Sequence, residues 1–218
     1  MPPYKAVLFD LDGTLLNTLE DLADSVNAAL GKLGFDPRPV PNYRYYVGDG
    51  LETSIRRALP DGADDDATVQ RCMAAMREEY ARRWNAKTAP YPGVPEMLDG
   101  LVARGLKMAV LSNKPDRFTK QCVAGLLGEW SFDVVLGVSE DVPIKPDPTG
   151  ALRVSRELNV APDEFLYLGD TATDMRAAHA AGMYPVGALW GFRTAQELRD
   201  AGAALLIGYP PELLDLLD

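Results

Sequence analysis

The sequence predicts an α/β fold in which helices cover a parallel sheet and a helical module is inserted after the first strand. Two observations carry this prediction. Short apolar runs alternate along the chain with segments of helical periodicity, which is typical of a parallel sheet. The stretch from Leu16 to Pro90 interrupts this alternation, because it shows only amphipathic helical patterns and no clear strand.

The sheet elements are short and strongly apolar. The expected strands are Ala6–Phe9, Met108–Leu111, Val134–Leu136, Phe165–Leu168 and Val186–Leu189, with Leu205–Ile207 as a further candidate. Helical periodicity between them predicts helices over Asp116–Leu127, Thr149–Leu158 and Asp174–Ala181.

The inserted module contains three helical patterns, over Leu19–Leu33, Leu51–Leu59 and Ala67–Asn85. Asn17 or Thr18 is suited to cap the first of these helices. Tyr91-Pro92-Gly93 then marks the return to alternating strands and helices. We therefore expect a catalytic core made of residues 1–15 and 91–218, and a helical cap made of residues 16–90.

Composition limits the classes of function. The 218 residues carry a net charge of −10, which argues against a general nucleic-acid surface. No apolar run approaches the roughly 20 residues of a membrane span, and the start of the chain does not resemble a secretory signal. With two cysteines a disulfide framework is not expected, so we predict a cytoplasmic protein, as a monomer or homodimer. His179 is the single histidine, which argues against a histidine-based triad or a multi-histidine metal site.

Two carboxylates follow the first strand directly. Asp10 and Asp12 lie one residue apart, and Gly13 allows the chain to turn sharply behind them. Residues i and i+2 share a face in extended chain, so both side chains can converge on one reacting centre. This end of a parallel strand is where open α/β sheets bind ligands. A simple Asp-Gly turn is the alternative explanation.

Three further segments place polar residues after expected strands. Ser112 and Asn113 follow the second strand, Lys145 lies in the proline-bracketed segment Lys145-Pro146-Asp147-Pro148, and Asp170 and Asp174 follow the fourth strand. Each has a local alternative: a helix cap for Ser112 and Asn113, a solvated lysine, and a cap with a carboxylate beside the helix dipole. The occurrence of all of them in this order, each at a strand end, favours one shared site.

The charges of this expected site indicate its ligand. Two carboxylates about 4 Å apart repel by roughly 4 kcal/mol at an effective dielectric of 20, so four of them require protons or a cation. Oxygen ligands without histidine or thiolate favour a hard ion such as Mg²⁺. Lys145, Ser112 and Asn113 supply donors for a phosphoryl group. Asp10 is the natural nucleophile, and Asp12 can protonate the leaving oxygen and then activate water.

These motifs resemble those of the haloacid dehalogenase superfamily, and the chain is similar to its phosphoglycolate phosphatases. The match runs in order from Phe9 to Asp174. The resemblance implies a Rossmann-like core with a helical cap and a small phosphorylated metabolite as substrate. It implies Mg²⁺ bound by the Asp10 carboxylate, the Asp12 main-chain carbonyl and Asp170, with Asp174 orienting a metal-bound water or the loop. It also implies that Ser112 and Lys145 bind phosphate. Dehalogenases of the superfamily lack the second acid, so Asp12 favours phosphatase or phosphomutase chemistry.

Residues of the cap and of the segment after the fifth expected strand indicate the substrate. The cap segment Val47-Gly48-Asp49-Gly50-Leu51-Glu52 and the segment Ala188–Arg193 resemble phosphoglycolate phosphatases, and Arg56 can meet a substrate carboxylate. A solvated arginine is the alternative for Arg56. A sugar phosphomutase of the β-phosphoglucomutase type shares every core motif, and a catalytically idle binding protein on the same scaffold is a third hypothesis. A phosphonatase is disfavoured, because it needs a cap lysine that forms a Schiff base with an aldehyde and the sequence presents no clear one. The main candidate, Lys32, lies beside Gly31 and Gly34 near a helix end.

Overall fold

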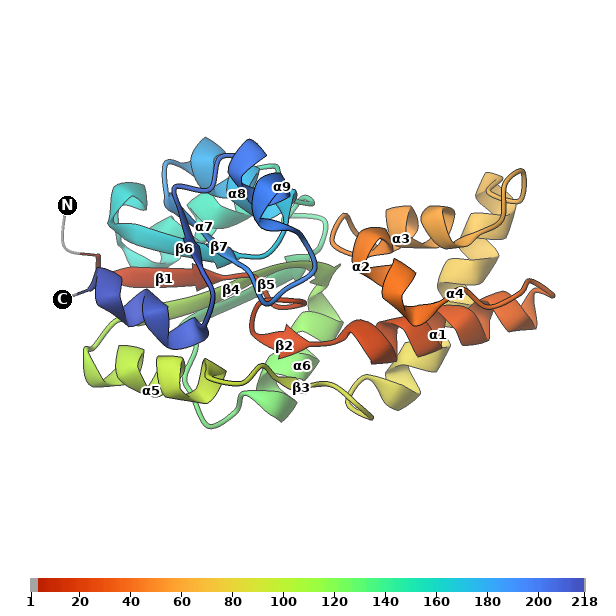
Figure 1. The fold of residues 1–218 in the computed structure, drawn as a ribbon, viewed down its shortest axis with the longest axis horizontal. Helices are drawn as coiled ribbons and strands as arrows, with labels where there is room; N and C mark the ends of the chain where they lie inside the picture. The colour runs from red at the N-terminus through yellow and green to blue at the C-terminus, as the bar shows by residue number, and fades with distance from the viewer. Residues whose placement is uncertain (1–3, 218) are drawn as a thin grey trace.

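The protein contains a six-stranded parallel sheet with helices on both faces (Figure 1). The computed structural model describes residues 4–217. The strand order is β5-β4-β1-β6-β7-β8. The strands are β1 (Ala6–Phe9), β4 (Lys107–Pro115), β5 (Val134–Val138), β6 (Phe165–Gly169), β7 (Tyr184–Ala188) and β8 (Leu205–Ile207). This arrangement confirms the predicted α/β class and all six predicted strand positions.

Two apolar clusters fill the space between the sheet and its helices. On one face lie α5 (Val94–Ala103), α6 (Asp116–Leu126) and the 3-10 segment Pro210–Leu216, which pack on side chains such as Val7, Phe9 and Val110. On the other face, α7 (Thr149–Leu158) and α8 (Ala172–Ala181) pack on Leu8 and Tyr167, among others. The short α9 (Ala195–Asp200) precedes β8. Apolar residues thus cover both faces of the sheet, as buried parallel strands require.

The central strand β1 determines where the polar segments emerge. Its four residues are fully buried between β4 and β6, and Phe9 is in register with Val110 on one side and Leu168 on the other. The amide of Asp10 continues the ladder by donating to the carbonyl of Leu168 at 2.9 Å. The residues after these three strands therefore leave the sheet at one level of its carboxyl edge.

The region after β1 forms a helical unit with its own apolar cluster. Figure 1 shows α1 (Leu19–Lys32), α2 (Tyr43–Tyr46), α3 (Leu51–Ala58) and α4 (Asp66–Arg83) at the end of the molecule opposite the two termini. Their shared cluster includes Leu30, Tyr43, Ile55 and Met76. The helices predicted for this region are present with ends shifted by one or two residues, and α2 is an additional short helix. The limits 1–15 with 91–218 for the core and 16–90 for the cap stay our proposal.

One expectation for this region is wrong at its two ends. Leu16–Asn17 (β2) and Ala89–Pro90 (β3) pair as a short antiparallel ribbon where the chain enters and leaves the helical unit (Figure 1). Strands of two residues carry no detectable periodicity, so the sequence pattern does not reveal them. Beside the ribbon, the buried carboxylate of Asp21 in α1 accepts hydrogen bonds from the amides of Lys87 and Thr88 and from the Thr88 hydroxyl.

The N-terminus of α1 lies where it was expected but lacks a side-chain cap. Thr18 occupies the N-cap position of α1, as predicted, but its side chain makes no capping hydrogen bond. Within residues 4–217, no helix is both long enough and apolar enough to cross a bilayer.

Candidate active site

The polar residues predicted from the strand ends meet at the carboxyl edge of the sheet. Asp10 follows β1, Asp170 follows β6, and Lys145 lies in the loop between β5 and α7. Ser112 and Asn113 were expected just beyond their strand, but β4 extends to Pro115 with a register irregularity after Leu111. The irregularity lets the strand end carry several polar side chains toward the site.

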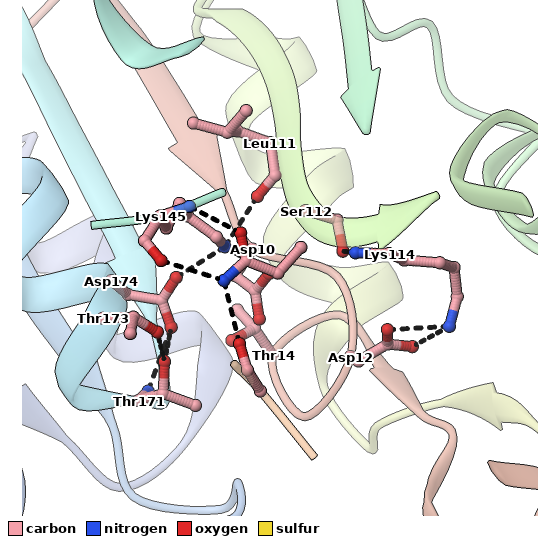
Figure 2. A network of polar contacts seen from close by, with 12 residues as sticks. Asp10, Asp12, Thr14, Leu111, Ser112, Lys114, Lys145, Thr171, Thr173 and Asp174 are labelled. Carbon is pink, nitrogen blue, oxygen red and sulfur yellow. Dashed lines mark hydrogen bonds and ion pairs between the residues drawn. The ribbon is translucent and has the colours of Figure 1, made fainter. Parts of the chain in front are cut away.

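Lys145 is the centre of the cluster. Its ammonium lies 2.7 Å from Asp10 Oδ1 and 2.7 Å from Asp174 Oδ1, and it donates to the carbonyl of Leu111 at 2.9 Å (Figure 2). The side chain is 3% exposed. All three ammonium donors are therefore engaged, which holds the lysine in one position between two carboxylates.

Burial makes the charges of this cluster interdependent. Burial and the nearby Asp174 carboxylate raise the pKa of Asp10 well above its usual range, although Lys145 opposes the change. Burial alone would lower the pKa of Lys145, but the carboxylates of Asp10 and Asp174 outweigh it and raise that pKa. The lysine is therefore the permanent cation of the site, and the carboxylates exceed it in number.

Asp170 is completely buried beside Asp10 and Asp174. Its Oδ1 accepts a hydrogen bond from the Thr14 hydroxyl at 3.0 Å, and its Oδ2 accepts one from the amide of Phe192 at 2.7 Å. Burial and the Asp174 charge raise the pKa of Asp170 to about 7. A second positive charge beside these groups would favour their ionised forms.

Asp174 lies in the first turn of α8 and connects this helix to Lys145. Its Oδ2 accepts from the backbone amide of Thr171 at 3.0 Å and from the Thr171 hydroxyl at 2.5 Å (Figure 2). The predicted place of Asp174 beside the helix dipole and its predicted site role thus coexist, since Oδ1 binds Lys145. The N-cap of α8 is Thr171, so the alternative that Asp170 caps this helix is wrong. With both oxygens engaged, Asp174 is suited to orient its neighbours.

The residues present fit a metal ion. Asp10, Asp170 and Asp174 are buried, and each offers a carboxylate oxygen within 4.8 Å of the other two. An all-oxygen donor set suits a hard cation. Gly13 has a φ of +93°, and a Cβ there would lie 2.3 Å from Asp170 Oδ2, so only glycine lets the loop after β1 approach this carboxylate so closely.

Asp12 faces a different partner from Asp10. Its carboxylate forms a bidentate ion pair with Lys114, with Nζ 2.9 Å from Oδ1 and 2.7 Å from Oδ2 (Figure 2). The same ammonium lies 4.8 Å from the centre of the Tyr80 ring, which belongs to α4. The two acids of the first motif are thus each neutralised by a separate buried lysine.

Ser112 and Asn113 reach the site in different ways. The Ser112 hydroxyl oxygen accepts a hydrogen bond from the amide of Lys114 at 3.2 Å. The side-chain amide of Asn113 forms hydrogen bonds with the main chain. It donates to the carbonyls of Gly48 and Lys145 and accepts from the amide of Lys145. Asn113 therefore ties the Lys145 loop to the segment before α3.

A cavity of about 70 Å³ lies between the sheet edge and the helical unit. Its sheet side is polar and includes Asp10, Asp12 and Lys145. The side formed by the helices is mainly apolar, and its lining residues there include Leu22, Val26, Leu51, Met76 and Tyr80. The cavity suits a small ligand whose polar groups face the sheet edge.

Among the residues predicted to bind the substrate, Arg56 is the one that does not line this cavity. It lies on α3 and binds Glu52 at 2.8 Å, Asp66 at 2.6 Å and the carbonyl of Asp64 at 2.8 Å. Acidic partners close in sequence hold the guanidinium at the surface. Arg77 of α4 lines the cavity instead.

Sequence reasoning missed Lys114 and Thr14 as site residues. Lys114 directly follows Ser112 and Asn113, so its place in that motif was the available signal. Thr14 follows Gly13, but its bond to Asp170 joins residues 156 positions apart and gives no local signal. Trp190 donates to the carbonyl of Thr14 at 2.9 Å and thereby links the segment after β7 to the loop after β1.

Comparison with known proteins agrees with this geometry. Residues 7–188 match the model of the family described as "Haloacid dehalogenase-like hydrolase". A phosphoglycolate phosphatase of Pseudomonas putida (strain KT2440) is 34% identical over 207 residues, which cover 93% of this chain and 76% of that protein. A phosphoglycolate phosphatase of Nitrosospira multiformis is 33% identical over 199 residues, covering 90% of this chain and 88% of that protein.

Solved structures show the same fold. A predicted phosphoglycolate phosphatase from Haemophilus somnus 129PT superimposes with a TM-score of 0.92 at 25% identity, over 100% of both chains. A predicted phosphatase from Clostridium acetobutylicum does so with a TM-score of 0.86 at 26% identity, over 98% of both chains. With the family match over most of its length and the acidic site at the expected strand ends, this chain is an enzyme of the haloacid dehalogenase-like hydrolase family.

Proposed function

We propose that this enzyme is a magnesium-dependent phosphomonoester phosphatase that acts through a phosphorylated Asp10, with 2-phosphoglycolate as its preferred substrate. The main support is the arrangement of Asp10 and Asp12. The first is bonded to Lys145 deep in the site, and the second lies at the same cavity with its own lysine. Relatives named phosphoglycolate phosphatase support the substrate.

The first chemical step uses Asp10 as nucleophile. One of its carboxylate oxygens attacks phosphorus, a new P–O bond forms, and the bond to the ester oxygen breaks. Asp12, in its protonated form, gives its proton to the departing ester oxygen. Lys145 keeps Asp10 in position and balances part of the negative charge of the phosphoryl group.

The second step returns the enzyme to its starting state. Water attacks the phosphorus of the aspartyl-phosphate while Asp12 takes its proton, and the bond to Asp10 breaks to release inorganic phosphate. Ser112 can donate its hydroxyl hydrogen to a phosphoryl oxygen. Asp10, Asp170 and the main-chain carbonyl of Asp12 would hold Mg²⁺, with Asp174 orienting the site, and bound Mg²⁺ supplies charge for the phosphoryl oxygens.

Features of the cavity favour a small phosphoester over the alternatives. Sugar hydroxyls need hydrogen-bond partners, but the helical side of the cavity is mainly apolar, which disfavours a sugar phosphomutase. For a phosphonatase, Lys32 would have to act as an amine nucleophile. Its ammonium is bound to Glu79 at 2.9 Å, and hydrogen bonds to Glu79 and Glu78 raise its pKa.

The test is phosphate release from a panel of small phosphoesters with and without Mg²⁺. The panel contains 2-phosphoglycolate and β-glucose 1-phosphate, and products are identified as well as counted. We expect magnesium-dependent hydrolysis with a preference for 2-phosphoglycolate, abolished in Asp10→Asn. Conversion of β-glucose 1-phosphate to an isomer with little free phosphate would replace the proposal with the mutase. No turnover of any substrate would favour the binding-protein hypothesis.

A further inference from the structure

Lys114 is a buried lysine that lines the cavity but has no part in the chemistry described above. It is 7% exposed and lies at the end of β4. Its ammonium is fixed from two sides, by the carboxylate of Asp12 and by the ring of Tyr80, which is itself 1% exposed. The bidentate contact makes Lys114 the buried charge partner of Asp12.

The neighbouring cations are less available to a second anionic group of the substrate. The ammonium of Lys145 is surrounded by Asp10, Asp174 and the carbonyl of Leu111. Arg56 is held outside the cavity by Glu52 and Asp66. Lys114 uses its donors on the two oxygens of one carboxylate, and a lysine has three donors. It can therefore bind Asp12 and a second anion together.

The chemistry proposed for Asp12 places the carboxylate of the substrate close to Lys114. In the proposed reaction Asp12 protonates the ester oxygen, so that oxygen must come within hydrogen-bond reach of its carboxylate. In 2-phosphoglycolate the carboxylate carbon is two bonds from the ester oxygen. A substrate that presents its ester oxygen to Asp12 thus places its carboxylate beside the ammonium already bound to Asp12.

Charge balance supports the same conclusion. A substrate carboxylate beside Asp12 would face two acids of the first motif, and like charges at this separation repel. Lys114 is the buried cation next to Asp12, and Tyr80 keeps bulk water from one side of it. An ion pair in such a site is strengthened by the low local dielectric.

We propose that Lys114 binds the carboxylate of the substrate and makes the enzyme selective for small phosphoesters that carry a carboxylate next to the ester. The inference rests on the proposed phosphatase function. It assigns to a lysine of the core the role that sequence reasoning gave to Arg56 of the cap. Arg77 also lines the cavity but is exposed, so its guanidinium has to compete with water for any anion.

The experiment compares 2-phosphoglycolate with the amide of its carboxyl group. The amide has nearly the same shape and the same phosphate group but lacks the carboxylate charge. The readout is the ratio of kcat/KM for the acid to kcat/KM for the amide. We expect Lys114→Met to lower this ratio roughly 10- to 100-fold, the range of a lost charge-assisted hydrogen bond, and Lys114→Arg to retain part of it. The charge-matched control is Lys120→Met, because Lys120 is exposed and paired with Asp116 at 2.7 Å; it should leave the ratio unchanged.

The ratio separates recognition from the effect of Lys114 on Asp12. If the loss of Lys114 impairs Asp12 as an acid, kcat falls for both substrates alike, and this shared loss cancels in the ratio. An unchanged ratio in Lys114→Met would overturn the inference. A lowered ratio in Arg77→Met with an unchanged ratio in Lys114→Met would assign carboxylate binding to Arg77. If the methionine variant does not fold, Lys114→Gln, which retains a polar side chain, replaces it.

A binding measurement covers the case in which turnover is absent. In the Asp10→Asn background, calorimetry of 2-phosphoglycolate and of its amide gives the same ratio without catalysis. Weaker binding of the acid alone after Lys114→Met supports the inference. Equal binding of both compounds in both proteins contradicts it. A wild-type enzyme that binds 2-phosphoglycolate through Lys114 without hydrolysing it would refute the proposed function and leave the recognition site standing.

Discussion

The ammonium of Lys145 lies 2.7 Å from Asp10 Oδ1, although the two residues are 135 positions apart in the chain. The same ammonium binds Asp174, so one buried cation joins the loops after β1 and β5 to the first turn of α8. This contact connects the predicted nucleophile to the predicted phosphate-binding residue. It is the basis of the first two predictions.

Asp10→Asn should lower kcat by more than about 1,000-fold, because an amide cannot replace the carboxylate as nucleophile. The fold should persist, since burial already disfavours the charge of Asp10. Steady-state phosphate release and circular dichroism check both parts. Hydrolysis at an undiminished rate would mean that another group attacks phosphorus.

Lys145→Ala should weaken binding of inorganic phosphate by about tenfold or more, because charge-assisted hydrogen bonds are lost and Asp10 and Asp174 then face each other unneutralised. Isothermal titration calorimetry of the variant and the wild type with inorganic phosphate measures the change in affinity. Lys107→Ala is a suitable control, since Lys107 donates to the carbonyl of Leu158 outside the cavity. Equal affinities for phosphate in the Lys145 variant and the wild type would contradict the assignment.

Asp170→Asn should stabilise the metal-free protein at neutral pH by about 1 kcal/mol or more. Burial and the Asp174 charge raise the pKa of Asp170 to about 7, so its charge is disfavoured in the folded state, and one pKa unit corresponds to about 1.4 kcal/mol. Mg²⁺ should raise the Tm of the wild type and have little effect on the variant. Thermal unfolding with and without Mg²⁺ checks both expectations. An equal Mg²⁺ effect in both proteins would place the ion elsewhere.

Asp21→Ala should lower the free energy of unfolding by about 3 kcal/mol, because the amides of Lys87 and Thr88 and the buried Thr88 hydroxyl lose their acceptor. Asp24→Ala is the control on the same helix. Asp24 makes a partly exposed ion pair with Lys87 at 2.9 Å, so its loss should change stability by less than about 1 kcal/mol. Urea titration of the two variants distinguishes them, and equal effects would argue against a role of Asp21 in holding the ribbon.

The two thiols should resist modification in the folded enzyme at pH 8. Burial raises the pKa of Cys72 to about 11 and also raises that of Cys122, and both side chains are fully buried. A raised pKa keeps a thiol protonated at pH 8, and the thiolate is the reactive form. Reaction with a chromogenic disulfide should be slow in native protein and rapid in denaturant. Fast native labelling would show that the thiols are accessible.

The α/β class, the positions of the six sheet strands and the acidic motif after β1 can all be predicted from the amino-acid sequence. Buried parallel strands have to be continuous apolar runs, and the polar residues that end them interrupt those runs, so both leave a local signal. Asp10, Lys145, Asp170 and Asp174 were recognisable for this reason. The structure brings these four residues together at one edge of the sheet.

Which charged side chains come into contact is visible in the tertiary structure and not in the sequence. Arg56 is engaged by Glu52 and Asp66, while Lys114 faces Asp12 across 102 positions of the chain. Both are basic residues beside suggestive motifs, and no local pattern separates one that points to a cavity from one held at the surface. The two-residue strands β2 and β3 were hidden for a related reason, because pairing between distant segments creates them and periodicity does not.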